Sequence, residues 1–192
     1  MIQEAAIKVL RITRRQWLVG LACLWLAGGV ADGEDRSGVS EYQLKAAFLY
    51  NFTQFTEWPA DAFATADAPI VIGIVGEDPF GKTLDDAVRG EVVRGRPLVV
   101  QRFRADEDIG RCHILFIGRS EKERLRAVLI QLQGRPVLTV SDMNDFALEG
   151  GIVHLQLANK SVKLEINQAV AEEAGVQISA KLLRLARIAQ TK

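Results

Sequence analysis

Residues 69–76, PIVIGIVG, form a short and almost wholly apolar stretch between polar segments. The stretch is too short for a typical helix, and its isoleucine and valine side chains favour an extended chain, so it predicts a strand buried on both faces. Three further stretches are predicted to be strands because each holds a short run of apolar residues: 96–103 (RPLVVQRF), 113–118 (HILFIG) and 136–142 (PVLTVSD). Such strands belong in a mostly parallel sheet that helices cover on both faces.

Helical segments alternate with these strands. The longest, residues 41–58, has apolar residues at spacings of three and four, begins after the capping residue Ser40 and stops at Pro59. Shorter helices are expected within residues 76–90, over 120–132, from Asn167 to Gly175, and in AKLLRLARIAQ after Ser179.

The last predicted feature is a hairpin. Residues 152–167, IVHLQLANKSVKLEIN, alternate in polarity on either side of a turn at 158–160. The sequence therefore predicts one α/β domain over residues 40–192. We expect a single-domain layered fold with a mostly parallel sheet covered by helices on both faces, plus a terminal β-hairpin.

The first 31 residues have the pattern of an export signal. Residues 1–16 carry four basic residues and one acid, and residues 17–31 (WLVGLACLWLAGGVA) carry no charge. This apolar run is short for a membrane span, which needs about 20 residues, and it ends in small residues. The sequence predicts a signal peptide, residues 1–31, cleaved after Ala31, and a flexible tail over 32–39. An uncleaved membrane anchor is the alternative.

The export route is open to two interpretations. Arg14 and Arg15 resemble a twin-arginine export motif, but paired arginines are also common in ordinary signals. We therefore favour the general secretory (Sec) route over the twin-arginine route.

Removal of the predicted signal peptide changes the net charge and the cysteine count of the chain. The whole chain has 24 basic and 24 acidic residues in 192, which is ordinary globular composition. Removing residues 1–31 takes away four basic residues and one acid, and leaves 161 residues with a formal charge of −3. This charge argues against a protein built on nucleic-acid phosphates. The processed chain keeps one cysteine, Cys112, so it has no internal disulfide. We expect Cys112 to be buried; pairing between chains is the alternative.

One segment matches an enzyme motif. Residues 76–83, GEDPFGKT, fit the pattern G-x-x-x-x-G-K-[ST] of phosphate-binding loops and follow a predicted strand. Asp142, at the end of another strand, is a candidate magnesium ligand. With Lys82 and Thr83, it suggests a nucleotide-binding hydrolase as an alternative function.

The chemistry of that loop argues against phosphate binding. Glu77 and Asp78 place negative charge where phosphate would lie, and Pro79 lacks a backbone N–H. We interpret the segment as a strand-to-helix turn, with Asp78 as the helix N-cap and Pro79 as the first helical residue.

No other reactive set is recognisable in the sequence. His113 is adjacent to Cys112, and neighbouring strand residues face opposite sides, so the two do not share a metal. His154 fits a structural residue in a strand. The chain lacks G-x-S-x-G, H-E-x-x-H and C-x-x-C. We predict no catalytic, cofactor-binding or metal-binding residues. A module that binds a small ligand above the strand ends is a further alternative.

The long helix has two apolar faces. Phe48, Phe52, Phe55 and Trp58 form a stripe that suits the core. The roughly opposite side is a candidate surface for a protein partner, because aromatic residues are enriched in interface cores. A helix buried on both sides is the alternative. The candidate partner-contacting residues are Tyr42, Ala46, Leu49 and Thr53.

Several short blocks follow one another along the chain in a definite order and spacing. They are 45–52 (KAAFLYNF), 57–59 (EWP), Gly76-x-Asp78-Pro79-Phe80-Gly81, 112–117 (CHILFI), 137–142 (VLTVSD), Phe146, Gly150-Gly151, 165–167 (EIN), Ile178-Ser179, Leu182-Leu183 and Leu185-Ala186. Together these blocks resemble the YfiR-like family of exported bacterial proteins. The resemblance covers about residues 41–189, and the order and spacing of the blocks are more specific than any single block.

The resemblance implies a function without catalysis. It implies a dimeric periplasmic α/β protein that binds the periplasmic sensor region of an inner-membrane diguanylate cyclase and holds it inactive. Cyclic-di-GMP signalling, and with it biofilm formation, is then lowered. An OmpA-like outer-membrane lipoprotein is implied as a second partner that sequesters the repressor. Some members form disulfides between further cysteines, and Cys112 alone does not allow that control here. The Gly-x-Asp-Pro-Phe-Gly turn belongs to the family pattern, so Lys82 and Thr83 look like local variation.

Overall fold

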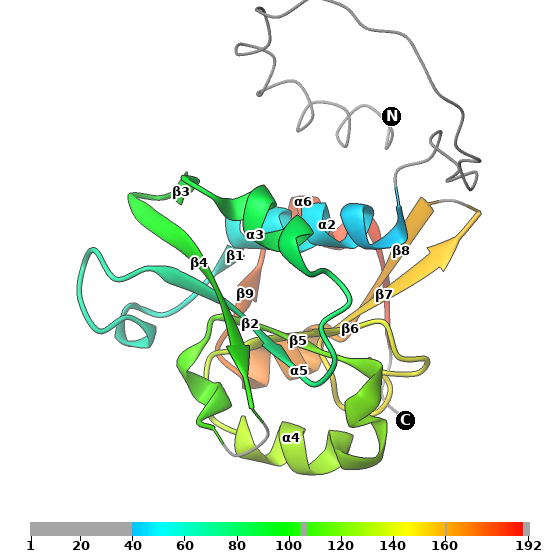
Figure 1. The fold of residues 1–192 in the computed structure, drawn as a ribbon. Coiled ribbons are helices and arrows are strands. Elements are labelled where there is room, and N and C mark those ends of the chain that lie inside the picture. The colour runs from blue at the N-terminus through cyan, green and yellow to red at the C-terminus, as the bar shows by residue number, and fades with distance from the viewer. Residues whose placement is uncertain (1–39, 105–106, 160, 190–192) are drawn as a thin grey trace, which may run out of the picture. The chain divides into compact units, whose positions relative to one another are not determined.

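The structure, a computed structural model, describes residues 40–104, 107–159 and 161–189. These residues form an eight-stranded sheet with the order β10-β8-β7-β6-β5-β2-β4-β3 (Figure 1). Neighbouring strands are parallel except in the pairs β7–β8 and β3–β4. The strands are β2 (Ile70–Val75), β3 (Val92–Val93), β4 (Arg96–Phe103), β5 (Ile114–Ile117), β6 (Leu138–Ser141), β7 (Val153–Ala158), β8 (Ser161–Ile166) and β10 (Ala186–Ile188). The predicted mostly parallel sheet and its β7–β8 hairpin are confirmed.

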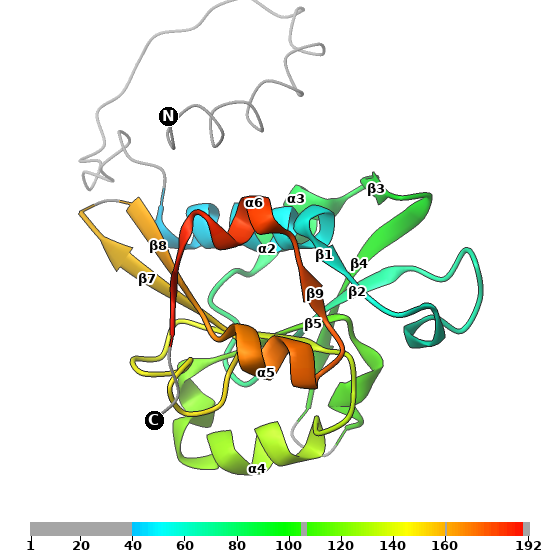
Figure 2. The ribbon, with the colours of Figure 1, turned by 180° about the vertical axis from the view of Figure 1, so that it is seen from behind.

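Helices cover both faces of this sheet (Figures 1 and 2). One side carries α2 (Glu41–Phe55), α3 (Lys82–Val88) and α6 (Ala180–Leu183), and the other carries α4 (Leu125–Gln131). The remaining helical elements are α5 (Gln168–Glu173) and the 3₁₀ helices η1 (Ala60–Ala62), η2 (Ile109–Arg111) and η3 (Arg119–Arg124).

The apolar strands separate two cores. In β5, Ile114 and Phe116 belong to the larger core beneath α2, whereas Leu115 and Ile117 belong to the smaller core beneath α4. Successive side chains of a strand point to opposite faces, so a strand covered on both sides must be apolar at every position. This arrangement explains the unbroken apolar runs in the sequence.

Helix α2 begins where the sequence predicts and ends earlier. The side chain of Ser40 accepts the backbone N–H of Gln43, and Gln43 returns a bond to the backbone of Ser40, which completes a capping box. The helix stops at Phe55 because Thr56 and Glu57 form strand β1, which pairs with β9 (Gln177–Ile178). This two-stranded sheet was not predicted.

The C-terminal segment differs from its prediction. Ser179 caps α6 as expected, but the helix has only four residues and does not continue through AKLLRLARIAQ. Residues 186–188 instead form β10, which pairs in parallel with β8, and the N–H of Ala189 donates to Ile166 O. Pairing with the edge of β8 gives the backbone of residues 186–188 hydrogen bonds, and these bonds outweigh the helix propensity of this segment.

The predicted signal peptide, its cleavage after Ala31 and the tail 32–39 lie outside the described residues. Within the described ranges, no helix is long and apolar enough to cross a membrane.

Candidate functional site

A buried ion pair lies where the parallel strands end. Asp142 directly follows β6, and Lys45 comes from the first half of α2. The Nζ atom of Lys45 lies 2.6 Å from Oδ2 of Asp142, and the two side chains are 0% and 2% exposed. Lys45 also contacts the carboxylate of Glu41, one helical turn earlier. The pair ties α2 to the sheet.

Two further side chains complete the bonding of Asp142. Nε of Arg119, in η3, lies 3.1 Å from Oδ1, and the hydroxyl of Tyr42 donates to Oδ2 at 3.2 Å. We call Glu41, Tyr42, Lys45, Arg119 and Asp142 the ionic cluster. It contains two acids and two bases, so its formal charge is zero.

The electrostatics of the cluster favour an ionised Asp142. Burial raises the pKa of this carboxyl, but the hydrogen bond and charge of Lys45, followed by those of Arg119, outweigh burial and hold its pKa below the ordinary 3.8. Burial, and then the charge of Asp142, raises the pKa of the Tyr42 hydroxyl. Asp142 is therefore a carboxylate whose two oxygens already accept hydrogen bonds, Oδ2 from Lys45 and Tyr42 and Oδ1 from Arg119. A carboxylate bound in this way offers no free ligand for magnesium.

The turn that matches a phosphate-binding loop is also internally bonded. Oδ1 of Asp78 accepts the N–H of Phe80 at 2.8 Å and that of Gly81 at 3.3 Å, and Oδ2 lies 2.8 Å from Nε of Arg102. The ring of Phe80 is buried, with edge contacts to Tyr42 and Phe116. The loop is filled by its own side chains, which supports its interpretation as a turn.

The capping prediction for this turn is wrong in detail. Helix α3 begins at Lys82 with Gly81 as N-cap, so Asp78 caps the preceding turn rather than the helix. Pro79 accordingly lies before the helix. Gly81 has a φ of 50°, a left-handed conformation that bends the chain immediately before the helix starts.

The position at which such sheets usually bind ligands is closed. After β2 the chain passes through α3 on one face of the sheet, and after β5 it passes through α4 on the other face. In such sheets the crevice between these two strands, at their carboxyl ends, is the expected ligand-binding site. There the N–H of Glu77 donates to Oγ of Ser120 at 2.8 Å, and the N–H of Gly118 donates to Val75 O at 2.9 Å. A Cβ at Gly118 would lie 2.6 Å from Glu77 O. The two loops touch, which argues against a small-ligand site between them.

The side of α2 that carries the four candidate partner-contacting residues faces the interior of the domain. Ala46, Leu49 and Thr53 are buried, and only Tyr42 keeps an exposed part. We therefore correct this expectation: small and medium side chains let the helix approach the sheet closely. On the aromatic stripe Phe52 is also buried, while Phe48 and Phe55 are partly exposed, so the helix is closer to the alternative of burial on both sides.

The histidines and the cysteine have structural surroundings. The ring of His113 stacks on Phe63 at 4.4 Å, its Nδ1 accepts the N–H of Val71, and burial lowers its pKa to about 4. Burial raises the pKa of the Cys112 thiol to about 12. His154 is buried 3.4 Å from Glu165. Among the described residues, no group of three or more His, Cys, Asp or Glu side chains is placed to hold a metal ion.

Sequence reasoning missed the ionic cluster. Lys45 has the position of an ordinary helix-surface lysine, four residues after Glu41. The signal was present in two of the quoted blocks, since KAAFLYNF begins with Lys45 and VLTVSD ends with Asp142. Only the folded chain shows that they meet.

The fold and its closed strand ends define a layered α/β domain in which Asp78 and Asp142, the acids at the strand ends, are bonded to neighbouring basic side chains. A family model described as YfiR/HmsC-like matches residues 42–187, which is most of the chain. The chain belongs to the YfiR/HmsC-like family. Membership in this family, a regulatory and non-catalytic one, fits a periplasmic regulator of cyclic-di-GMP signalling.

Proposed function

We propose that this protein binds the periplasmic sensor region of an inner-membrane diguanylate cyclase and holds the enzyme inactive, so that cyclic-di-GMP signalling falls. The family match over residues 42–187 is the observation that carries the proposal. An OmpA-like outer-membrane lipoprotein that sequesters the repressor, and a homodimeric state, are further parts of it.

The internal bonding of the domain supports a binding role. A nucleotide hydrolase would rely on Lys82, Thr83 and Asp142, but Asp142 is bonded to Lys45 and Arg119. Within the loop that would hold phosphate, Asp78 is bonded to Arg102. A protein that acts by contact needs a rigid scaffold and an accessible surface, and it needs no free nucleophile or base. On α2, Tyr42 is the candidate contact residue that remains accessible in part.

The proposal includes the route to the periplasm. Residues 1–31 would direct export by the Sec route and be removed after Ala31. Mass spectrometry of the protein recovered from the periplasm tests this directly, and a mature N-terminus at Asp32 is the expected result.

The central test uses the diguanylate cyclase with a periplasmic sensor that is encoded nearest to this protein. The purified protein is expected to bind the isolated sensor region in calorimetry, and deletion of the gene should raise cellular cyclic-di-GMP. Restoring the gene should reverse the rise. Absence of binding together with unchanged cyclic-di-GMP in the deletion strain would refute the proposal.

A further inference from the structure

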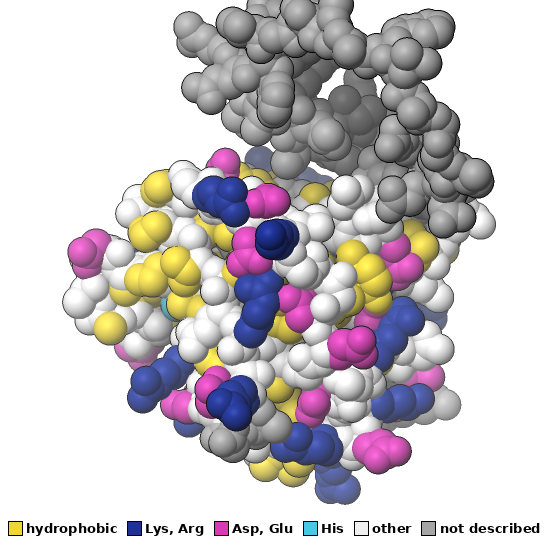
Figure 3. Space-filling view, viewed as in Figure 1, with side chains coloured by type: hydrophobic (Ala, Val, Ile, Leu, Met, Phe, Trp, Pro, Cys, Tyr) yellow, Lys and Arg dark blue, Asp and Glu magenta, His cyan; other side chains and the backbone are white. Residues whose placement is uncertain are grey.

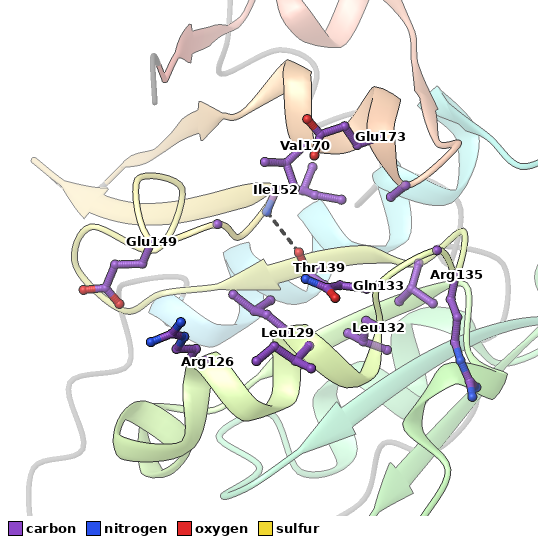
Figure 4. Close-up of a pocket in the computed structure, with 15 residues that line it drawn as sticks. Arg126, Leu129, Leu132, Gln133, Arg135, Thr139, Glu149, Ile152, Val170 and Glu173 are labelled. Carbon is purple, nitrogen blue, oxygen red and sulfur yellow. Dashed lines mark hydrogen bonds between the residues drawn. The ribbon is translucent and has the colours of Figure 1, made fainter. Parts of the chain in front are cut away.

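A hollow on the described surface lies between α4 and α5. It has a volume of about 410 Å³ and opens over β6 (Figure 4). Its apolar walls come from both helices and from the strands between them. The hydroxyl oxygen of Thr139, on the floor, already accepts the N–H of Ile152 at 2.9 Å. The apolar lining residues are Leu129, Ile130, Leu132, Val137, Ile152 and Val170.

Charges of opposite sign lie on the two sides of this hollow. Arg126 on α4 and Arg135 in the turn after it are on one side, whereas Glu149 before β7 and Glu173 on α5 are on the other (Figure 4). Arg135 is bonded to Asp108. Arg126, Glu149 and Glu173 form no ion pair with any residue that the structure describes. A basic side and an acidic side therefore face each other across an apolar floor.

Each side of the hollow also has an exposed apolar side chain. Ile130, on the basic side, is 53% exposed, and Leu148, next to Glu149 on the acidic side, is 47% exposed. In the space-filling view, apolar side chains reach the surface among charges of both signs around α4 (Figure 3). Apolar surface surrounded by charged residues is the pattern of a protein interface.

We propose that the hollow between α4 and α5 is the surface through which two copies of this chain associate. A two-fold contact uses the same patch on both copies, so the patch must be complementary to itself. A two-fold axis along the hollow brings the basic side of one copy onto the acidic side of the other. An axis across the hollow would place like charges together, so the charges select the first arrangement.

This arrangement assigns specific contacts. Arg126 of each copy faces Glu149 of the other, because both lie at the same end of the hollow (Figure 4). Ile130, one turn after Arg126, and Leu148, next to Glu149, bring exposed apolar surface to the same interface. The two-fold axis repeats the Arg126–Glu149 contact, and these two contacts fix the relative orientation of the copies. Burial of apolar surface supplies the affinity.

The inference rests on the homodimeric state in the proposed function and adds its surface. Sedimentation equilibrium on the purified protein tests it. We expect a dimer whose dissociation constant rises about tenfold or more in Arg126→Glu and in Glu149→Arg, because each reversal acts twice. The double variant should return to within about threefold of the original value, since the charges then match again. Ile130→Asp should also weaken the dimer.

A matched control comes from the other end of the sheet. Val92 on β3 is 59% exposed, and Val92→Asp should leave the dissociation constant unchanged. Circular dichroism must show the same fold for every variant. A protein that stays monomeric, a dimer insensitive to all of these changes, or a double variant no better than the single ones would overturn the inference. Sensor binding measured on the same samples separates this failure from failure of the proposed function.

Discussion

Replacing Lys45 by methionine should destabilise the protein far more than removing any exposed lysine or arginine charge. Methionine keeps most of the buried volume but removes the ammonium group that lies 2.6 Å from Asp142. Breaking a buried ion pair costs about 3–5 kcal/mol, because the remaining charge stays buried without its partner. Arg119 still contacts Asp142, but its side chain is 63% exposed and solvent screens its charge. We therefore expect a loss of about 3 kcal/mol.

Urea unfolding at neutral pH measures this loss. With a slope of about 1–3 kcal/mol/M, the midpoint should fall by about 1–3 M. Arg89→Met is the matched control, because Arg89 pairs with Asp86 at the surface and its loss should cost about 1 kcal/mol or less. In a double-mutant cycle, Lys45→Met with Asp142→Asn should recover at least about 1 kcal/mol of the summed single losses. A Lys45→Met loss no larger than the Arg89→Met control, or strict additivity in the cycle, would refute the assigned role of the pair.

Three other predictions follow from groups described above. The pKa of Asp142 lies below its ordinary 3.8, so its stabilisation is complete above that value and is lost as the pH falls through the lower pKa of the folded state; acid unfolding monitored by circular dichroism should be less steep in Asp142→Asn. Cys112, with a pKa raised to about 12 by burial, should react with a thiol reagent at pH 8 only after unfolding, and fast labelling of the native protein would contradict its burial. Gly151→Ala should cost about 1–3 kcal/mol, because a Cβ there would overlap the ring of Phe146; a thermal midpoint equal to that of the original protein would disprove the close contact.

The sequence predicts the strands well for a simple physical reason. β2, β5 and β6 are covered on both sides, and burial on two faces leaves an apolar run that no exposed element of this length would show. The β7–β8 hairpin is also predictable, because its alternation and its turn are local. The C-terminal strand β10 is not predictable, because the partner that makes it a strand is β8, about 20 residues earlier.

The ionic cluster and the orientation of α2 depend on tertiary structure. Lys45, Ala46 and Leu49 face the sheet, although the aromatic stripe has the larger apolar area. Helix periodicity identifies the two faces but does not say which of them must approach a sheet closely. The partner of Lys45 lies almost 100 positions away, so no local pattern identifies that lysine as buried.

The Lys45–Asp142 pair also has a consequence for the order in which the chain folds. A chain that emerges with its N-terminus first presents α2 at the start, but the carboxylate that neutralises Lys45 follows 97 residues later. Until then, closing α2 onto the sheet would bury the ammonium group with only the partly exposed Glu41 as its counterion, which is energetically unfavourable. Contacts of such large separation in sequence slow folding. Fragments that end before residue 142 lack this carboxylate, so we expect them to form the native packing of their first helix less stably than the whole domain does.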